Sequence, residues 1–119
     1  MRELDTLQTS DKLNLVFAQD EAGVGNANHV YEVYTAGGDE PIATIKFQHG
    51  PRRDPDSTPG VLDTDLLEIV RDRLIGFQSG EFACRENALA LTHIEDALLW
   101  MDKRVRDRTK RGVLGTNQK

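Results

Sequence analysis

The sequence predicts an α+β fold, in which a small N-terminal antiparallel β-sheet is followed by a C-terminal two-helix hairpin that oligomerises. Two stretches after residue 62 carry apolar residues at helical spacings of three and four. Three short β-branched or aromatic stretches precede residue 49, and a segment with three of the four prolines lies between the two groups. We therefore divide the chain into a sheet region (1–49), a linker (50–61) and a helical hairpin with a basic tail (62–119).

The strands are predicted from alternation and from β-branched and aromatic content. They are Leu13–Gln19, His29–Ala36 and Pro41–Gln48. Glycine, asparagine and aspartate cluster between them and indicate short turns, which favours an antiparallel sheet. Residues 1–12 are polar, and we expect them to be loosely held. The open edges of such a sheet need cover from the hairpin or from a neighbouring subunit.

The hairpin is predicted from the periodicity of its apolar residues. Its inner faces are expected to carry Leu66, Val70, Leu74 and Phe77 on the first helix and Leu91, Ile94, Leu98, Met101 and Val105 on the second. Asp63 or Thr64 would cap the first helix. Further apolar residues lie off these faces: Leu62, Leu67, Ile69, Ile75, Leu89, Leu99 and Trp100. Because two helices leave these residues uncovered, we expect self-association.

Composition restricts the classes of function. A net charge of −5 argues against binding to long nucleic acid or to anionic membranes. The stretch 102–119 nevertheless holds seven Lys or Arg against two Asp, which favours a small anionic ligand. The single cysteine, Cys84, excludes an internal disulfide framework, and we expect it to be a small buried helix residue. The sequence shows no secretory signal and no membrane-spanning run, so we expect a soluble intracellular protein.

Catalytic and metal-binding patterns are not apparent in the sequence. His29, His49 and His93 lack the spacing of paired metal ligands, and one cysteine cannot form a zinc cluster. The carboxylates of the second helix are dispersed. We therefore predict that the protein is not an enzyme and uses no metal or cofactor.

Residues suited to binding a nucleotide are present. Arg104, Arg108 and Arg111 share one face of the second helix, where they would either complement the helix dipole or hold phosphate oxygens. Phe77 and Phe82 flank the turn between the helices. They would serve either as core side chains or as stacking surfaces for a base.

Two further positions complete this set. Asn87 lies just inside the second helix and carries an amide able to hydrogen-bond a base or a ribose. In the proline-rich segment, Arg52 or Arg53 would either contact a phosphate or pair with Asp54 or Asp56.

The chain from Phe47 to Thr116 resembles a known family. The run GFQSGEFACRENALALTHIEDALLWMDKRVRDRTKRGVLGT, with its ACREN and RxxRGVxGT elements, is similar to the helical hairpin shared by phage Thoeris anti-defence proteins and anti-CBASS proteins. The segment FQHGPR, which follows the predicted sheet, resembles the type one Thoeris anti-defence members.

This resemblance implies a protein that sequesters cyclic nucleotide immune signals in the cytoplasm of the infected bacterial host, without cleaving them. The ligands implied are glycocyclic ADP-ribose of Thoeris and, for some members, cyclic di- or trinucleotides of CBASS. Assembly into homohexamers through the hairpins is implied as well. The alternative is a structural or regulatory oligomeric hairpin protein that binds nucleic acid.

The resemblance also implies roles for individual residues. The expected ligand-binding residues are Arg52, Phe77, Phe82, Asn87, Arg104, Arg108 and Arg111. Arg104 and Arg108 would hold the pyrophosphate, either phenylalanine would stack on adenine, and Arg52 would close over the ligand. Asn87 points about 100° away from Arg104 around the helix, which favours a site shared between subunits.

Overall fold

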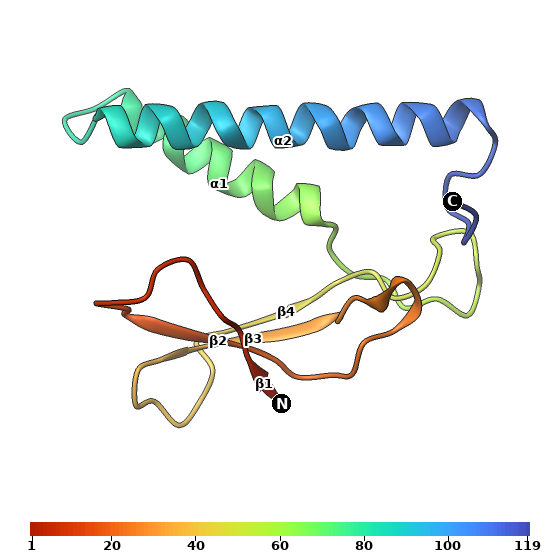
Figure 1. The fold of residues 1–119 in the computed structure, drawn as a ribbon, viewed down its shortest axis with the longest axis horizontal. Helices are drawn as coiled ribbons and strands as arrows, with labels where there is room; N and C mark the ends of the chain where they lie inside the picture. Colours follow the sequence, from red (N-terminus) through yellow and green to blue (C-terminus); the bar gives the residue numbers. More distant parts are fainter. The chain divides into compact units, whose positions relative to one another are not determined.

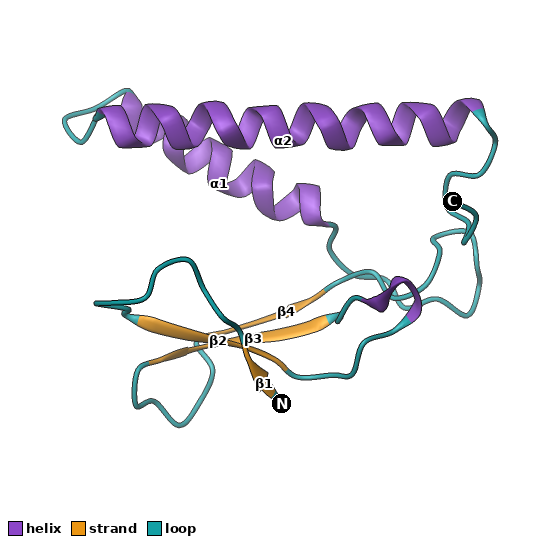
Figure 2. Cartoon of the chain, in the orientation of Figure 1, coloured by secondary structure: helices purple, strands orange, loops and turns teal.

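The computed structural model describes residues 1–119, which form two compact units, Met1–Val61 and Leu62–Lys119. The first unit contains a four-stranded antiparallel sheet, and the second contains two helices (Figure 1). The predicted order of a sheet followed by a helical hairpin is confirmed (Figure 2). Neither helix is both long and apolar enough to cross a membrane.

The sheet is a meander in the order β1-β2-β3-β4. Its strands are β1 (Arg2–Glu3), β2 (Asn14–Ala18), β3 (Val30–Thr35) and β4 (Ala43–Lys46). The last three fall within the predicted stretches. The expectation of loosely held residues at 1–12 is wrong for β1, which pairs Arg2 with Ala18 and Glu3 with Phe17. A two-residue strand is too short to show alternation in the sequence.

Aromatic pairs stabilise the sheet across its strands. The rings of Phe17 and Tyr34 meet edge to face at 5.5 Å, and those of Tyr31 and Phe47 at 5.7 Å. Such pairs contribute roughly 0.5–1.5 kcal/mol beyond the burial of their area. Ala18, which is 1% exposed, is the one hydrophobic residue of the chain that is buried. The sheet therefore depends on cross-strand contacts more than on a deep core.

Asp20 closes the connection between β2 and β3. Its carboxylate accepts hydrogen bonds from the backbone N–H of His29 at 3.0 and 3.1 Å and of Val30 at 3.1 Å. Partial desolvation acts to raise the pKa of Asp20, but the hydrogen bonds from Val30 and His29 outweigh it and lower that pKa below its usual 3.8. The ionised carboxylate thus stabilises the start of β3.

The second unit consists of α1 (Asp63–Gln78) and α2 (Arg85–Lys110). The cap of α1 is Leu62 and not Asp63 or Thr64 as predicted. This earlier start is stabilised by Asp65, whose carboxylate accepts the backbone N–H of Leu62 at 2.8 Å.

Cys84 precedes α2 and is exposed, so the prediction of a buried helix residue is wrong. Its sulfur accepts the N–H of Asn87 at 3.4 Å, which makes it the N-cap of the helix. The side chain of Gln78 braces the turn by hydrogen-bonding the backbone N–H of Cys84 at 3.0 Å and its carbonyl at 3.1 Å.

The inner face of α1 differs from the predicted one. Leu66 and Leu74 are half-buried as predicted. Val70 and Phe77 are 42% and 40% exposed, and Leu67, which was not predicted, is half-buried. The physical reason is Arg71, which enters the contact between the helices and donates from Nε to Glu95 at 2.8 Å. This hydrogen bond raises the pKa of Arg71.

The inner face of α2 agrees with the prediction except at its end. Leu91, Ile94, Leu98 and Met101 are half-buried, whereas Val105 is exposed. Leu99 and Trp100 lie off this face and are 65% and 70% exposed. The hairpin therefore retains an apolar surface that its own two helices do not cover.

We predict that Asp20→Asn lowers the melting temperature at pH 7. Because the pKa of Asp20 is lowered by folding, its stabilisation is present above pH 3.8 and is lost as the pH falls through the folded pKa. The difference from the parent should therefore shrink in scans run well below pH 3.8. A difference of equal size at pH 7 and in strong acid would contradict this role. Asp5→Asn, in the exposed N-terminal segment, is the control.

Candidate ligand-binding site

Two of the three arginines predicted to bind the ligand are accessible at the C-terminal end of α2. Arg104 is exposed and makes no ion pair within the chain. Arg111 is also exposed, and its Nε lies 3.3 Å from the carboxylate of Asp107. An exposed pair of this kind contributes at most about 1 kcal/mol, so an anionic ligand can compete with Asp107 for Arg111.

Arg108 differs from its two neighbours because it is only 6% exposed. Its guanidinium donates to the carbonyl oxygens of Val113 at 2.9 Å, Thr116 at 3.0 Å and Gln118. These three bonds fold the tail after α2 back against the helix. Within one chain Arg108 therefore positions the tail.

The tail has a backbone conformation that depends on two glycines. Gly112, with φ of +71°, ends α2, and the N–H of Val113 returns to the carbonyl of Arg108 at 3.0 Å. Gly115, with φ of +77°, then allows a turn in which Thr116 donates to the carbonyl of Val113 at 3.1 Å. The RxxRGVxGT element is thus explained by folding, whatever further role it has.

The other end of the hairpin carries the two phenylalanines of the predicted set. Phe82 is 69% exposed and Phe77 is 40% exposed, so neither is a core side chain. The guanidinium of Arg73 lies 5.5 Å from the ring centroid of Phe77 and occupies one side of it. Asn87, in the first turn of α2, is half-buried, and its side-chain amide makes no hydrogen bond within the chain. These groups form an aromatic end with unused stacking and hydrogen-bonding capacity.

The aromatic end and the basic end are far apart in one chain. Asn87 and Arg104 are separated by 17 positions on one continuous helix, or about 25 Å at a rise of 1.5 Å per residue. One small ligand cannot touch both. Arg52 belongs to the other unit, where it is exposed and pairs with neither Asp54 nor Asp56.

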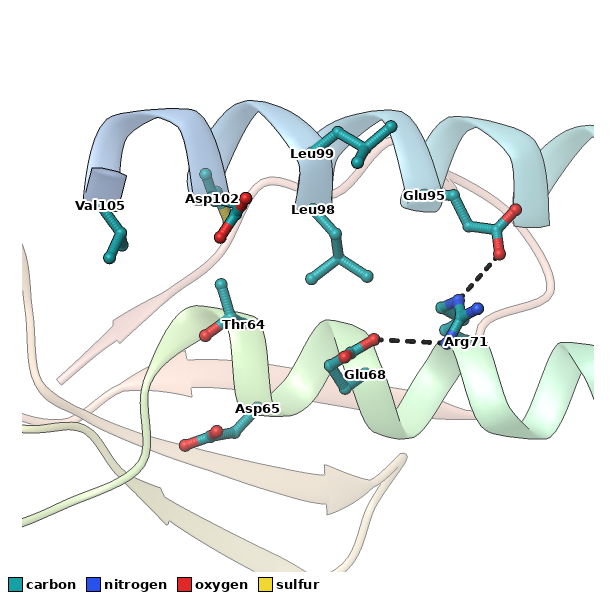
Figure 3. Close-up of a pocket in the computed structure, with 10 residues that line it drawn as sticks. Thr64, Asp65, Glu68, Arg71, Glu95, Leu98, Leu99, Asp102 and Val105 are labelled. Carbon is teal, nitrogen blue, oxygen red and sulfur yellow. Dashed lines mark hydrogen bonds and ion pairs between the residues drawn. The ribbon is translucent and has the colours of Figure 1, made fainter. Parts of the chain in front are cut away.

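A groove of about 690 Å³ lies between α1 and α2 (Figure 3). Its apolar lining is Leu98, Leu99, Met101 and Val105, and its charged lining is Asp65, Glu68, Arg71, Glu95 and Asp102. Arg71 is shared by Glu95 at 2.8 Å and Glu68 at 3.8 Å. With four carboxylates against one cation, the groove repels a phosphorylated ligand. None of the predicted ligand-binding residues lines it.

One residue of the aromatic end was missed from the sequence. Arg73 stands four positions before Phe77 in α1, and this spacing places two side chains on one helix face. That spacing could have predicted the contact between Arg73 and Phe77. The contact adds a cation beside the ring that is expected to stack on a base.

We predict that Arg108→Ala releases the tail. Hydrogen bonds to a charged group contribute about 1.5–3 kcal/mol, so amide hydrogen exchange at Val113 and Thr116 should accelerate by roughly tenfold or more. The matched control is Arg104→Ala, which removes an arginine without tail contacts and should leave these two rates unchanged. Protected tail amides in Arg108→Ala would contradict the role of this guanidinium.

Comparison with known proteins places this geometry in a family. A family model described as the Acb2/Tad1, hairpin domain matches residues 39–106, which include most of both helices. The chain is also 47% identical over 78 residues to Thoeris anti-defense 1 of Bacillus phage SBSphiJ7. That alignment covers 66% of this chain and 54% of the relative, so the chain spans about half the length of the curated relative it matches. The resemblance seen in the sequence is confirmed, and the chain belongs to the Acb2/Tad1 hairpin-domain family.

Proposed function

We propose that this protein is a phage anti-defence protein that binds cyclic nucleotide immune signals and sequesters them without cleavage. The observation that carries the proposal is the 47% identity to Thoeris anti-defense 1 over 78 residues. The ligand class is glycocyclic ADP-ribose of Thoeris, with cyclic oligonucleotides of CBASS as further candidates. The proposed place of action is the cytoplasm of the infected host.

The chemistry of the two ends of the hairpin supports this ligand class. Arg104 and Arg111 offer accessible guanidiniums for a pyrophosphate, at about 1.5–3 kcal/mol for each charge-assisted hydrogen bond. Phe82 offers an open ring for a base, and stacking contributes roughly 1–3 kcal/mol per base. These groups hold a ligand, and none of them is a nucleophile or a general base. Tight binding without turnover is the behaviour that sequestration requires.

Arg108 can join the proposed site only by changing partners. In the free chain, three neutral carbonyl oxygens occupy its donors. A phosphate oxygen is a stronger acceptor for this guanidinium than a carbonyl oxygen, because the phosphate carries a negative charge and the carbonyl does not. We therefore propose that Arg104 and Arg111 contact the ligand directly. Arg108 would contact it only after releasing the tail.

The separation of the two ends supports a site shared by two subunits. In an antiparallel pair of α2 helices related by a twofold axis at Leu99, position 87 of one chain lies opposite position 111 of the other. Asn87 would then face Arg111 of the second copy, and the aromatic end would meet the basic end. Leu99 and Trp100, both largely exposed, would lie at the centre of this contact. Further copies on the remaining apolar surface would complete the hexamer implied by the family resemblance.

We predict that calorimetric titration with glycocyclic ADP-ribose detects submicromolar binding by the parent protein. Intact ligand should be recovered after denaturation. Arg104→Ala should weaken binding by one to two decades, because it removes charge-assisted hydrogen bonds to the pyrophosphate. Arg106→Ala is the matched control, since Arg106 is an exposed arginine about 200° around the helix from Arg104 and outside the predicted set.

The outcomes of this titration separate the alternatives. Altered ligand after denaturation would mean catalysis and would overturn sequestration. Binding of neither glycocyclic ADP-ribose nor a cyclic trinucleotide would overturn the proposed ligand class. Salt-dependent binding to duplex DNA in its place would favour the nucleic-acid-binding alternative.

We predict that two inactive variants restore each other when they are refolded together. Phe82→Ala and Arg111→Ala chains, each weak alone, would form mixed pairs in which one site has both residues intact and the other has neither. Random pairing of equal amounts should restore about a quarter of the sites. Titration of the mixture measures this fraction directly.

A site within one chain would give no such recovery, and that result would exclude the shared site. Trp100→Glu provides a second check, because Trp100 lies near the proposed twofold contact and is not a predicted ligand residue. We expect it to lower the molar mass measured by light scattering and to weaken ligand binding at the same time. Unchanged mass and unchanged affinity would contradict the proposed pairing.

A further inference from the structure

The proline-rich segment of the first unit forms a loop whose two ends are hydrogen-bonded to each other. We call these paired ends the base of the loop. His49 and Thr58 exchange backbone hydrogen bonds of 2.9 and 2.8 Å. Next to them, Gln48 donates to Val61 at 2.9 Å, and Val61 donates to Lys46 at 2.9 Å. The segment predicted as a linker therefore begins and ends at the same place, beside the end of β4.

The side chain of Gln48 connects the two sides of this base. Its Nε2 donates to the carbonyl of Gly50 at 3.2 Å and lies 3.4 Å from Oγ of Ser57, and its Oε1 accepts the N–H of Gly60 at 3.3 Å. One amide thus satisfies groups at both ends of the loop. An apolar side chain would leave all of them without this partner.

Glycine at position 60 allows the two sides of the loop base to approach each other closely. A Cβ on Gly60 would lie 2.4 Å from the carbonyl carbon of Phe47 and 2.6 Å from the backbone nitrogen of Gln48. Gly50, at the opposite side, has φ of +91°. The spacing of Gln48, Gly50 and Gly60 is therefore dictated by closure of the loop.

The tip of the loop presents two arginines without acidic partners. Asp54 donates its N–H to the carbonyl of Pro51 at 2.9 Å, which places Arg52 and Arg53 at the two central positions of a turn. The carboxylate of Asp54 accepts the N–H of Asp56 at 2.9 Å and is committed to the backbone. Arg52 and Arg53 are both exposed, and neither makes an ion pair.

We infer that Gln48 is a positioning residue that holds Arg52 and Arg53 as one preorganised contact for the phosphates of the bound nucleotide. The inference rests on the proposed function and adds two residues, Gln48 and Arg53, to it. A loop fixed before binding loses less conformational entropy when the ligand arrives. Its two guanidiniums are then presented together and not as independent, mobile charges.

The first test measures the loop without any ligand. Gln48→Met keeps the length of the side chain and removes its donor and its acceptor. We expect trypsin to cleave after Arg52 and Arg53 roughly tenfold faster in this variant, as followed by mass spectrometry. Gln8→Met, at an exposed glutamine with only local hydrogen bonds, should leave this rate unchanged. Equal cleavage of Gln48→Met and the parent would overturn the positioning role.

The second test measures binding of glycocyclic ADP-ribose. Gln48→Met should weaken binding roughly tenfold in the parent and should have no further effect in an Arg52→Ala, Arg53→Ala background. This lack of additivity is not expected from general destabilisation, which would weaken binding in both backgrounds. Additive losses would overturn the inference.

The failure of this inference is distinguishable from failure of the proposed function. If Arg104→Ala weakens binding and the Arg52→Ala, Arg53→Ala variant does not, the loop has no ligand role while sequestration stands. If the parent binds neither glycocyclic ADP-ribose nor a cyclic trinucleotide, both proposals fall together.

Discussion

Burial of apolar side chains is the constraint on which the rest of this structure depends. No large hydrophobic side chain is fully buried, and Ala18 is the only hydrophobic residue that is buried. A sheet of four short strands and a pair of helices each expose too much surface to form a thick core alone. Self-association would supply the missing cover, because it would bury residues such as Leu99 and Trp100.

Charge is distributed so that the two sides of the hairpin favour different contacts. The groove between the helices is rimmed by carboxylates, whereas the end of α2 carries arginines that remain accessible. This charge distribution would direct a phosphorylated ligand away from the groove and toward the helix end. The groove, with its apolar floor, is better suited to contact with protein. In the proposed assembly, two copies would contact each other along α2, and the ligand would lie at the ends of this contact.

Periodicity in the sequence predicts the elements of this fold but not the details that depend on individual polar contacts. The inner face of α2 follows from the spacing of its apolar residues, because four of the five predicted positions are half-buried. On α1 the same reasoning is right for Leu66 and Leu74 and wrong for Val70 and Phe77. There the bond between Arg71 and Glu95 places a charged residue in the contact. No single-helix pattern reveals a partner on another helix.

In the candidate site, too, the sequence predicts which residues lie together but not their individual polar contacts. Arg104, Arg108 and Arg111 are equivalent in the sequence as residues of one helix face, and the predicted grouping at the helix end follows from that. The burial of Arg108 does not, because it depends on where the tail places its carbonyl oxygens. The roles of these residues in ligand binding remain predictions. Their different environments now distinguish an arginine that organises the chain from two that are available to a partner.

The closed base of the loop at residues 48–61 also constrains how sequences of this family can vary in length. Gly60 packs against the backbone of β4 with no room for a side chain, and Gln48 fits one spacing between the two sides. An insertion or deletion at the base would break both contacts. At the tip, the exposed residues between Asp54 and Ser57 can be added or removed at little cost, because a longer loop loses little closure entropy. Relatives that keep this loop should therefore differ in length at its tip and align without gaps at its base.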